Sequence, residues 1–402
     1  MKDLLEEKTE RRTLARRLWS IQARGASPLL PKDAPPMSLL LLFTVLALAL
    51  FGTAMVFSAG YAYADFRYDD STYFMKRQTV FLGIGIIGML MLSRVSISFI
   101  ERITPLLYFL TLALLILVLM IGLVGNGAKR WISIGPITIQ PSEIAKVTLV
   151  LMLARYFTVF EPLALEKKRK DRIFIYGTLI PAALMLSVIL PVMLQKHLSC
   201  IIILGLIGAS LIVMSGCDTR YLRLVAILGI IGVTCLALFT DYTKDRITVW
   251  LDPEAYRLTG GWQTLQGLMA IGSGGIFGLG YGKSLLKYCY ISEPANDMIF
   301  TVLCEELGFI GAMAAMLLFA FLIYQGYRIA LRTENVFARL VALGIVSKIA
   351  IQTLLNIAVV TNTIPNTGIS LPFFSYGGSS LVMLFLEMGM LLSISRYATI
   401  QK

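Results

Sequence analysis

The chain has 402 residues, of which 57% are apolar and 15% are charged, and it carries a net charge of +12. Soluble domains are roughly 45–50% apolar and about 25% charged, so this composition excludes an ordinary soluble domain and predicts a polytopic membrane protein. The basic residues are scattered along short polar segments, which argues against a protein that binds nucleic acid.

Ten apolar stretches approach the ~20 residues that a helix needs to cross a bilayer. Each is expected to be a helix, because hydrocarbon offers no partner for exposed backbone amides. The stretches are residues 38–58, 77–93, 104–124, 143–159, 173–194, 198–215, 221–239, 297–325, 338–360 and 378–395. We therefore expect an all-α membrane protein, with a basic cytoplasmic arm over 1–36 and one ten-helix domain over 37–398.

The distribution of Lys and Arg predicts the orientation of these helices, because cytoplasmic segments carry the excess of basic residues. The two terminal segments and every second connection hold 23 of the 36 basic residues, whereas the other connections hold 12. Both termini are therefore expected in the cytoplasm. Residues 240–296 then form a large extracytoplasmic loop between the seventh and eighth helices.

The outer segment GAKRWISIGPITIQPSEIAK (127–146) carries positive charge against this trend, at Lys129, Arg130 and Lys146. From the residues alone, a clamp for phosphate and simple snorkelling to the membrane interface explain these cations equally well. Ser142 and Glu143 follow a proline and indicate the start of the fourth helix.

The large outer loop contains Gln263 and Gln266, which share one face if this stretch is helical. The glycine-rich residues that follow lack the strand context of a nucleotide-binding turn, so nucleotide binding is not expected. The single histidine, His197, lies in the outer turn QKHLSC (195–200) and is expected to be structural rather than catalytic.

The stretch SEPANDMIFTVLCEELGFIG (292–311) gathers carboxylates around the start of the eighth helix. Asp297 stands at the mouth of that helix, where it is either a helix cap or a catalytic group. Glu305 and Glu306 lie ~12–14 Å deeper along the helix. They project about 100° apart, so only one is expected to face the bundle interior, and we favour structural pairing over catalysis for both.

Two more charges, Lys348 and Glu387, lie at similar depths inside the ninth and tenth helices. They are expected to pair across adjacent helices, because an unpaired charge in hydrocarbon is costly. The last outer loop, residues 361–380, carries hydroxyl groups that either bind sugar or phosphate or cap the tenth helix. These hydroxyls belong to Ser375, Tyr376, Ser379 and Ser380.

Four outer stretches now stand in order on a ten-span chain: residues 127–146, WQTLQGLMAIGSGG (262–275), NDMIFTVLCEELGF (296–309) and TGISLPFFSYGGSS (367–380). Together they resemble the SEDS family, which includes FtsW, RodA and SpoVE, over roughly residues 38–400. FtsW and SpoVE look closer to this chain than RodA does.

The resemblance implies a peptidoglycan glycosyltransferase that polymerises lipid II on the outer face of the bacterial cytoplasmic membrane. Such an enzyme works with a class B penicillin-binding protein in cell division, cell shape or spore-wall synthesis. The essential aspartate of the family falls on Asp297, which becomes the expected base. Mg²⁺ or Mn²⁺ is a candidate cofactor, and no organic cofactor is expected. Substrate contacts are expected from Lys129, Arg130, Gln140, Ser142, Glu143, Lys146, Gln263, Gln266, Ser273, Ser375, Tyr376, Ser379 and Ser380.

The chain departs from the family pattern in several places. The turn at 195–200 replaces a QPDLGT-like turn, Asn296 stands where Thr is common, and Lys348 and Glu387 are atypical. Two other functions remain open, a lipid II transporter and a non-catalytic scaffold for the transpeptidase. A transporter would more often show paired repeats with broken helices, and neither is evident in the sequence.

Overall fold

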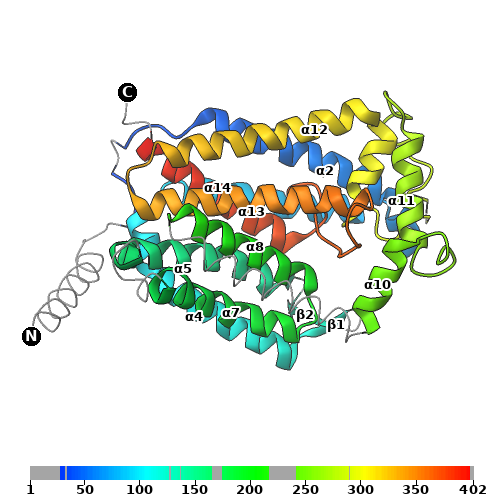
Figure 1. Cartoon of the computed structure of the whole chain (residues 1–402). Helices are drawn as coiled ribbons and strands as arrows, with labels where there is room; N and C mark the ends of the chain where they lie inside the picture. Colours follow the sequence, from blue (N-terminus) through cyan, green and yellow to red (C-terminus); the bar gives the residue numbers. More distant parts are fainter. Residues whose placement is uncertain are drawn as a thin grey trace, which may run out of the picture.

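The computed structural model describes residues 28–31, 34–125, 128–135, 137–164, 174–216, 241–288 and 290–398. Over these residues the chain forms an elongated bundle of helices (Figure 1). The helices are α2 (Leu39–Tyr68), α3 (Tyr73–Leu92), α4 (Ile97–Ile121), α5 (Pro141–Ala164), the π-helical turn η1 (Ile175–Leu179), α7 (Ile180–Leu194), α8 (Leu198–Met214), α10 (Asp241–Leu251), α11 (Trp262–Ser273), α12 (Ile299–Leu331), α13 (Val336–Val360) and α14 (Gly378–Ala398).

Most of the expected spans coincide with these helices. Within the described residues, seven helical segments are long and apolar enough to cross a membrane, namely α2, α3, α4, η1 with α7, α12, α13 and α14. Helix α5 and the shorter apolar helix α8 coincide with two further expected spans. The expected seventh span, 221–239, lies outside the described residues. The chain is therefore a multi-pass membrane protein.

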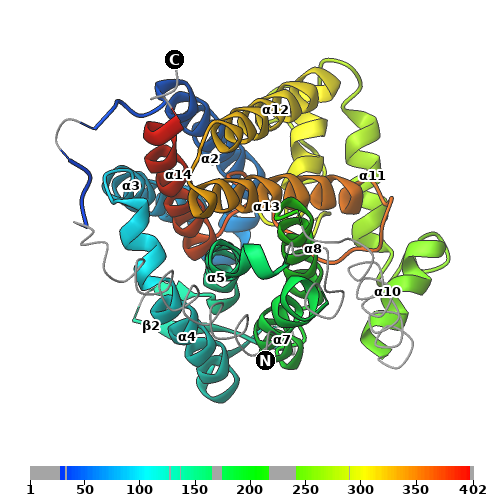
Figure 2. The ribbon, with the colours of Figure 1, turned by 60° about the vertical axis from the view of Figure 1, so that its left-hand side comes forward.

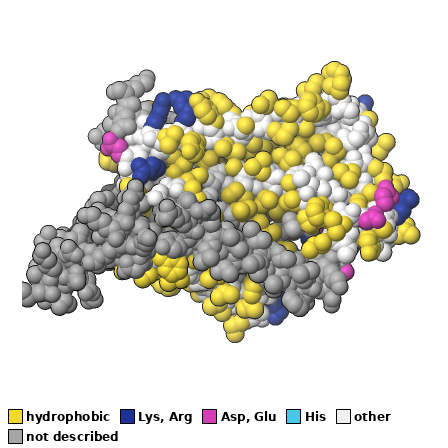
Figure 3. All heavy atoms as spheres, viewed as in Figure 1, with side chains coloured by type: hydrophobic (Ala, Val, Ile, Leu, Met, Phe, Trp, Pro, Cys, Tyr) yellow, Lys and Arg dark blue, Asp and Glu magenta, His cyan; other side chains and the backbone are white. Residues whose placement is uncertain are grey.

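The surface agrees with a membrane setting. Apolar side chains cover the flank of the bundle, whereas most charged side chains on this face lie towards its two ends (Figure 3). Among these seven spans, α13 and α14 are the most enclosed, with 61% and 67% of their apolar windows buried. The segment before α2 packs at the same end as the last turn of α14, where Arg396 Nη1 donates to Pro35 O at 2.9 Å.

One segment departs from the expected all-α fold. Residues 123–139 form a small antiparallel sheet of β1 (Leu123–Gly125), β2 (Ala128–Ile134) and β3 (Ile137–Ile139), in the order β1-β2-β3. Val, Ile, Thr and Trp in this stretch favour strands, and Gly135, with a φ of 61°, supplies the turn between β2 and β3. The sheet holds Arg130 and Trp131 at the end of the bundle that also carries α10 and α11 (Figure 1).

The eighth expected helix is broken, which corrects the expectation of a continuous span without breaks. Within α12, Gly308 has φ 64° and ψ −164°, a conformation that side-chain-bearing residues rarely adopt. The part before Gly308 and the longer part after it run in different directions (Figures 1 and 2). A glycine in an apolar run carries no local signal of such a break, so the sequence did not reveal it.

The glycine-rich segment after α11 satisfies the backbone groups that the break leaves open. Leu279 N and Gly280 N donate to the carbonyls of Glu305 and Glu306 at 3.0 and 2.9 Å. In return, Phe309 N donates to Gly275 O at 2.9 Å. Broken helices are tolerated at membrane depth when neighbouring protein supplies such partners. The glycines therefore serve close backbone approach.

Candidate active site

Asp297 lies in the loop directly before α12, and its side chain is partly buried. It is not the N-cap residue of the helix, which is Met298, and Met298 makes no side-chain capping bond. The capping explanation for an aspartate at this position is therefore not supported.

The backbone around Asp297 is held by neighbouring elements. Asn356 Nδ2, on α13, donates to Asp297 O at 2.9 Å, and Ser375 Oγ donates to Asn296 O at 2.7 Å. The loop is turned by Glu293, which has a φ of 50° and accepts from Asn296 Nδ2 at 2.8 Å. Because its backbone is anchored on α13 and on the loop before α14, Asp297 has a fixed position.

Asp297 faces a cavity of about 500 Å³. Five parts of the chain meet there: the sheet with the start of α5, the turn before α8, α10 with α11, the loop before α12, and α13 with the loop that follows it. Of the residues expected to act on substrate, the cavity contains Asp297, Arg130, Gln140, Glu143, Lys146 and Gln263. The cavity is thus lined by residues from all four sequence stretches, with residues 367–370 coming from the last of them.

The pKa of Asp297 is raised from 3.8 to about 6, chiefly by burial and then by the nearby carboxylate of Glu293. Arg246 acts in the opposite direction by favouring the ionised form. A carboxyl group with a pKa near 6 is a better proton acceptor at neutral pH than an ordinary aspartate and is still mostly ionised. This combination suits a general base.

Cations line the part of the cavity formed by the sheet, α5 and the turn before α8. Lys146 Nζ lies 2.8 Å from Glu143 Oε1, and both side chains are buried. Arg130 Nη2 donates to the carbonyl of Lys196 at 2.6 Å, which ties the sheet to the turn. A concentration of fixed cations at one side of a polar cavity fits an anionic group such as a phosphate.

His197 also lines this part of the cavity, although the sequence predicted a structural role for it. Burial, Arg130 and Lys146 together lower its pKa to about 3, so the imidazole is neutral at physiological pH. Its Nδ1 lies 3.4 Å from Ser142 Oγ. A neutral imidazole in contact with α5 fits a positioning role beside the cations.

The other residues expected at the site lie outside the cavity. Lys129 Nζ turns back to the carbonyls of Leu119 and Met120, at 3.3 and 3.4 Å. Gln266 is buried within the protein, and Ser273 Oγ donates to the carbonyl of Ala270 in its own helix at 3.0 Å.

The hydroxyl groups of the last outer loop brace the structure around the cavity. Ser379 Oγ accepts from Gln140 N at 3.4 Å, and Ser380 Oγ donates to Gly377 O at 3.1 Å. The ring of Tyr376 packs edge-on against that of Phe74, with centroids 4.7 Å apart.

Several cavity residues were not expected from the sequence to act on substrate. They are Lys196, Arg246, Glu293, Asn296, Gln352, Asn366 and Ser370, together with His197. Most lie in connections between helices, where polar residues are ordinary, so no local pattern distinguishes them. The available signal was Lys196 and Arg246, which are cations in segments that the charge bias predicts to be extracytoplasmic.

The buried carboxylates of α12 are structural, as the sequence predicted, but both of them are enclosed. The expectation that only one would face the interior was wrong, because the glycine-rich segment covers the side of the short helix that the bundle leaves open. Glu306 Oε1 lies 2.8 Å from Lys287 Nζ, and Ser58 Oγ also donates to this carboxylate. Glu305 accepts from Ser284 Oγ at 2.5 Å and from Leu285 N at 2.9 Å.

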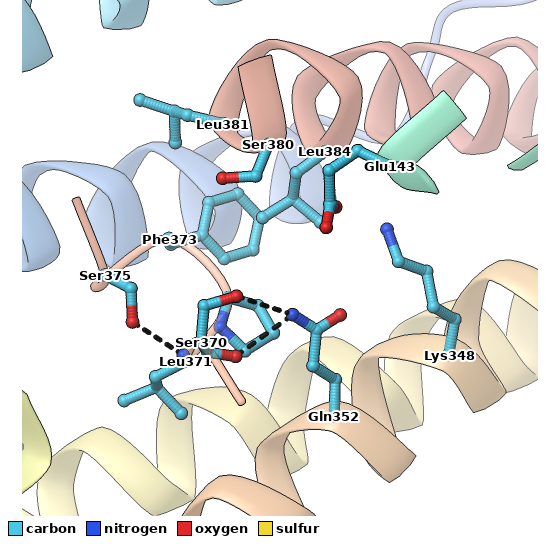
Figure 4. A pocket seen from close by; sticks show the side chains of 11 residues that line it. Glu143, Lys348, Gln352, Ser370, Leu371, Phe373, Ser375, Ser380, Leu381 and Leu384 are labelled. Carbon is cyan, nitrogen blue, oxygen red and sulfur yellow. Dashed lines mark hydrogen bonds between the residues drawn. The ribbon is translucent and has the colours of Figure 1, made fainter. Parts of the chain in front are cut away.

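Lys348 and Glu387 pair across α13 and α14, as predicted from their depth. Lys348 Nζ lies 2.5 Å from Glu387 Oε1, and their side chains are 3% and 0% exposed. Lys348 also points towards Glu143 across a water-sized cavity of about 20 Å³ (Figure 4). Because Glu143 lines both this small cavity and the large one, the buried pair continues directly into the wall of the candidate site.

A helix bundle with a polar cavity at one end, a carboxylate of raised pKa and a wall of cations fits a membrane protein with a binding site for an anionic group. The chain belongs to the FtsW, RodA and SpoVE family, described as "Cell cycle protein", which matches residues 38–400.

The relatives of the chain agree with this membership. Stage V sporulation protein E of Bacillus subtilis is 39% identical over 369 residues, which cover 91% of this chain and 99% of that protein. A probable peptidoglycan glycosyltransferase FtsW of Geobacter metallireducens is 33% identical over 367 residues, covering 90% and 96%.

Solved structures show the same fold. A chain from a study of polymerization and crosslinking by a peptidoglycan synthase complex has a TM-score of 0.75 at 27% identity, covering 91% of this chain and 99% of that one. The rod shape determining protein RodA of Thermus thermophilus has a TM-score of 0.65 at 28% identity, covering 90% and 97%.

Proposed function

We propose that the protein is a peptidoglycan glycosyltransferase that polymerises lipid II into glycan strands. The observation that carries this proposal is the cavity in which Asp297, with a pKa of about 6, faces a wall containing Arg130 and Lys146. The names of the FtsW relatives support the same activity. Stage V sporulation protein E is the relative with 39% identity, which supports a role in cell division or in the related synthesis of shape or spore wall.

The chemistry follows from the two kinds of group in the cavity. Asp297 accepts the proton of a sugar 4-hydroxyl as the oxygen attacks the anomeric carbon of the donor sugar. The bond from that carbon to the pyrophosphate breaks, and its electron pair leaves with the phosphate oxygen. Arg130 and Lys146 stabilise the charge that develops there. The α-linked donor and β-linked product require inversion, which one direct displacement provides.

The proposed orientation places the cavity on the outer side of the cytoplasmic membrane. The excess of basic residues in alternate segments supports cytoplasmic termini, ten spans and an extracytoplasmic loop over residues 240–296. The cavity elements α10, α11 and β2 lie at the end of the bundle opposite the C-terminus (Figure 1). A polyprenyl tail can then remain in the bilayer while the sugars enter the cavity. We retain one membrane domain over 37–398 and a cytoplasmic arm over 1–36.

A divalent cation, Mg²⁺ or Mn²⁺, remains a candidate cofactor. No cluster of three or more His, Cys, Asp or Glu side chains suited to a metal occurs among the described residues. Three carboxylates, those of Glu143, Glu293 and Asp297, line the cavity, and Glu143 is paired with Lys146. Mg²⁺ often takes one or two carboxylates and completes its ligands with substrate phosphates. These residues do not form a resident metal cage, and the proposed steps require none.

The proposed partner is a class B penicillin-binding protein, a transpeptidase that links the new strands. The structural match to a chain of a peptidoglycan synthase complex supports this pairing. Lipid II, the growing strand and the surrounding membrane lipid complete the set of partners, and nucleic acid is not among them.

One observation favours the rival function of lipid II transport, because the break of α12 at Gly308 is a feature of many transporters. Such proteins usually carry two broken helices in corresponding positions of a repeat. Among the described helices, α12 is the one that contains a residue with non-helical backbone angles, and the polar cavity lies next to the N-terminal end of α12. We therefore keep polymerisation as the conclusion.

The test is glycan polymerisation from lipid II by purified protein, with and without a class B partner and Mg²⁺. Asp297→Asn is the test variant, and Asp252→Asn is the matched control, because Asp252 is an exposed aspartate outside the cavity. We expect strands from the wild type and the control and none from an equally folded Asp297→Asn. Strands from all three proteins would show that Asp297 is not the base. Strands from none under any condition would favour the transporter or the scaffold.

A further inference from the structure

A second cavity of about 250 Å³ adjoins the one that contains Asp297. The two cavities share Arg246, Gln263 and Asn366 in their linings, so they adjoin, and we call them the first and second chambers of the hollow. The second chamber lies between α10, α11 and the loop after α13, and neither the base nor the cations Arg130 and Lys146 line it. The reaction proposed above uses only the first chamber, so the second has no assigned role.

The lining of the second chamber fits carbohydrate. Trp250 contributes an indole whose Nε1 donates to Asn362 O at 3.0 Å, which fixes the plane of the ring. Side-chain amides come from Gln263, Asn362 and Asn366. A fixed aromatic ring with a few amides offers an apolar surface for a sugar face and hydrogen-bond partners for its hydroxyl and acetamido groups.

The charges in this chamber do not fit a pyrophosphate. Arg246 is the one cation among its described lining residues, and the adjacent Asp245 lines the same chamber. Arg246 already donates to Asn366 O, so its guanidinium is held by the protein. In the first chamber, by contrast, Arg130, Lys146 and Lys196 gather on one side. The hollow therefore has a cationic end and an end lined by amides and an indole.

The direction of the displacement connects these two ends. With inversion, the attacking hydroxyl approaches the anomeric carbon from the side opposite the leaving pyrophosphate. The cations mark the leaving-group side, which is built from β2, α5 and the turn before α8. Helix α10, which carries Trp250, lies on the other side of α5 and α8 from β2 (Figure 2). The acceptor sugar must then enter from the side of α10 and α11.

We propose that the second chamber is the acceptor subsite, which binds the N-acetylglucosamine whose 4-hydroxyl attacks the donor. This assignment rests on the proposed function. The acceptor O4 forms a bond to the donor C1, its proton passes to Asp297, and the bond from C1 to phosphate breaks with its electron pair leaving on the pyrophosphate. Trp250 and the amides hold the acceptor so that O4 points at C1.

The chain offers a matched pair of tryptophans for the test. Trp250 Nε1 donates to Asn362 O at 3.0 Å, and Trp262 Nε1 donates to Tyr290 O at 2.8 Å. Only Trp250 lines the second chamber. The variants Trp250→Ala and Trp262→Ala therefore lose the same kind of indole and the same kind of hydrogen bond, but they differ in the loss of the subsite.

The kinetic experiment separates donor from acceptor. The donor-only substrate is lipid II whose GlcNAc 4-hydroxyl is capped by galactose. The acceptor-only substrate is lipid II with a methylene group in place of the oxygen that joins C1 to phosphate. We expect Trp250→Ala to raise the KM for the acceptor about tenfold, which corresponds to about 1.4 kcal/mol, and to leave the KM for the donor unchanged. Trp262→Ala should match the wild type in both. A rise in the donor KM alone, or no change in either KM, would overturn the assignment.

A binding measurement keeps the test independent of turnover. A lipid-free peptidoglycan tetrasaccharide is titrated into the three full-length proteins in detergent, and binding is followed by calorimetry. The wild type and Trp262→Ala should bind it alike, and Trp250→Ala should bind about tenfold more weakly. If no protein couples the two substrates but this binding pattern appears, polymerisation is wrong, and the second chamber is a glycan-binding site without an acceptor role. Equal binding by all three proteins refutes the subsite even if the wild type polymerises.

Discussion

The buried pair of Lys348 and Glu387 provides the sharpest stability prediction. Both side chains are nearly inaccessible, and Nζ lies 2.5 Å from Oε1. The second carboxylate oxygen of Glu387, Oε2, is buried without a hydrogen-bond partner. Removing one partner of a buried pair typically costs about 3–5 kcal/mol, because the remaining charge is left uncompensated.

The two single variants should not cost the same. In Lys348→Met, Glu387 loses the cation on Oε1 while its Oε2 is already unpartnered, so we expect the full loss of about 3–5 kcal/mol. In Glu387→Gln, Lys348 still faces Glu143 across the small cavity (Figure 4). One carboxylate then remains near the ammonium group, so we expect a smaller loss of about 2 kcal/mol.

The double variant Lys348→Met with Glu387→Gln leaves neither charge behind. The loss of unfolding free energy in the double variant should therefore be smaller, by at least about 2 kcal/mol, than the sum of the losses in the two single variants. Unfolding by SDS in mixed micelles measures all four proteins of the cycle. Lys76→Met is the control, because its pair with Asp70 is exposed, and it should leave the free energy of unfolding unchanged within error. Additive losses, or a larger loss for Glu387→Gln than for Lys348→Met, would refute the reasoning.

Further predictions concern Asp297 and the break in α12. Because the pKa of Asp297 is about 6, kcat/KM for polymerisation should fall as the pH drops through 6, and a fall centred near pH 4 would show that the carboxyl is unperturbed. The raised pKa also means that ionisation of Asp297 destabilises the folded state. Asp297→Asn should therefore raise the free energy of unfolding by about 1–2 kcal/mol at pH 8, where the carboxyl is ionised, and should leave it unchanged at pH 3, where the carboxyl is protonated. The gain is smaller than the pKa shift alone implies, because water in the cavity screens the charge. Gly308→Ala should lose more than about 2 kcal/mol, because its Cβ would lie 2.3 Å from Gly278 N at a φ of 64°. Gly83→Ala, with nothing within 4 Å, is the control and should retain or gain thermal stability in detergent.

The transmembrane helices could be predicted because length and hydrophobicity alone decide whether a segment sits in hydrocarbon. The pairing of Lys348 with Glu387 could be predicted from the same physics, because two opposite charges at similar depth in hydrocarbon are stabilised by pairing. The sheet over residues 123–139 was missed because its strands are short and their pairing depends on contacts with each other rather than on a long apolar run.

Residues of the candidate site could be predicted only where their charge departs from the general distribution of charges along the chain. Arg130 and Lys146 stand out as cations in a segment predicted to be extracytoplasmic, and Asp297 as a carboxylate at a helix entrance. Asn366 departs from no general pattern, because amides are ordinary in a connection between helices, and its place in the cavity depends on how the loop after α13 packs. Gln352 is an uncharged amide inside α13, and its place depends on which side of that helix faces the cavity. Both are tertiary properties with no signature in sequence spacing.

The break at Gly308 explains why Asp297 and the glycine-rich segment belong to one structural unit. The short helix before the break begins two residues after Asp297, and its two glutamates bind Ser284, Leu285 and Lys287 of that segment. These contacts are buried, so moving the segment would expose or unpair two carboxylates. The two glutamates project from different faces of this short helix, and the glycine-rich segment covers the face that the bundle leaves open. The break therefore fixes the position of Asp297 through the same buried network that makes the two glutamates tolerable.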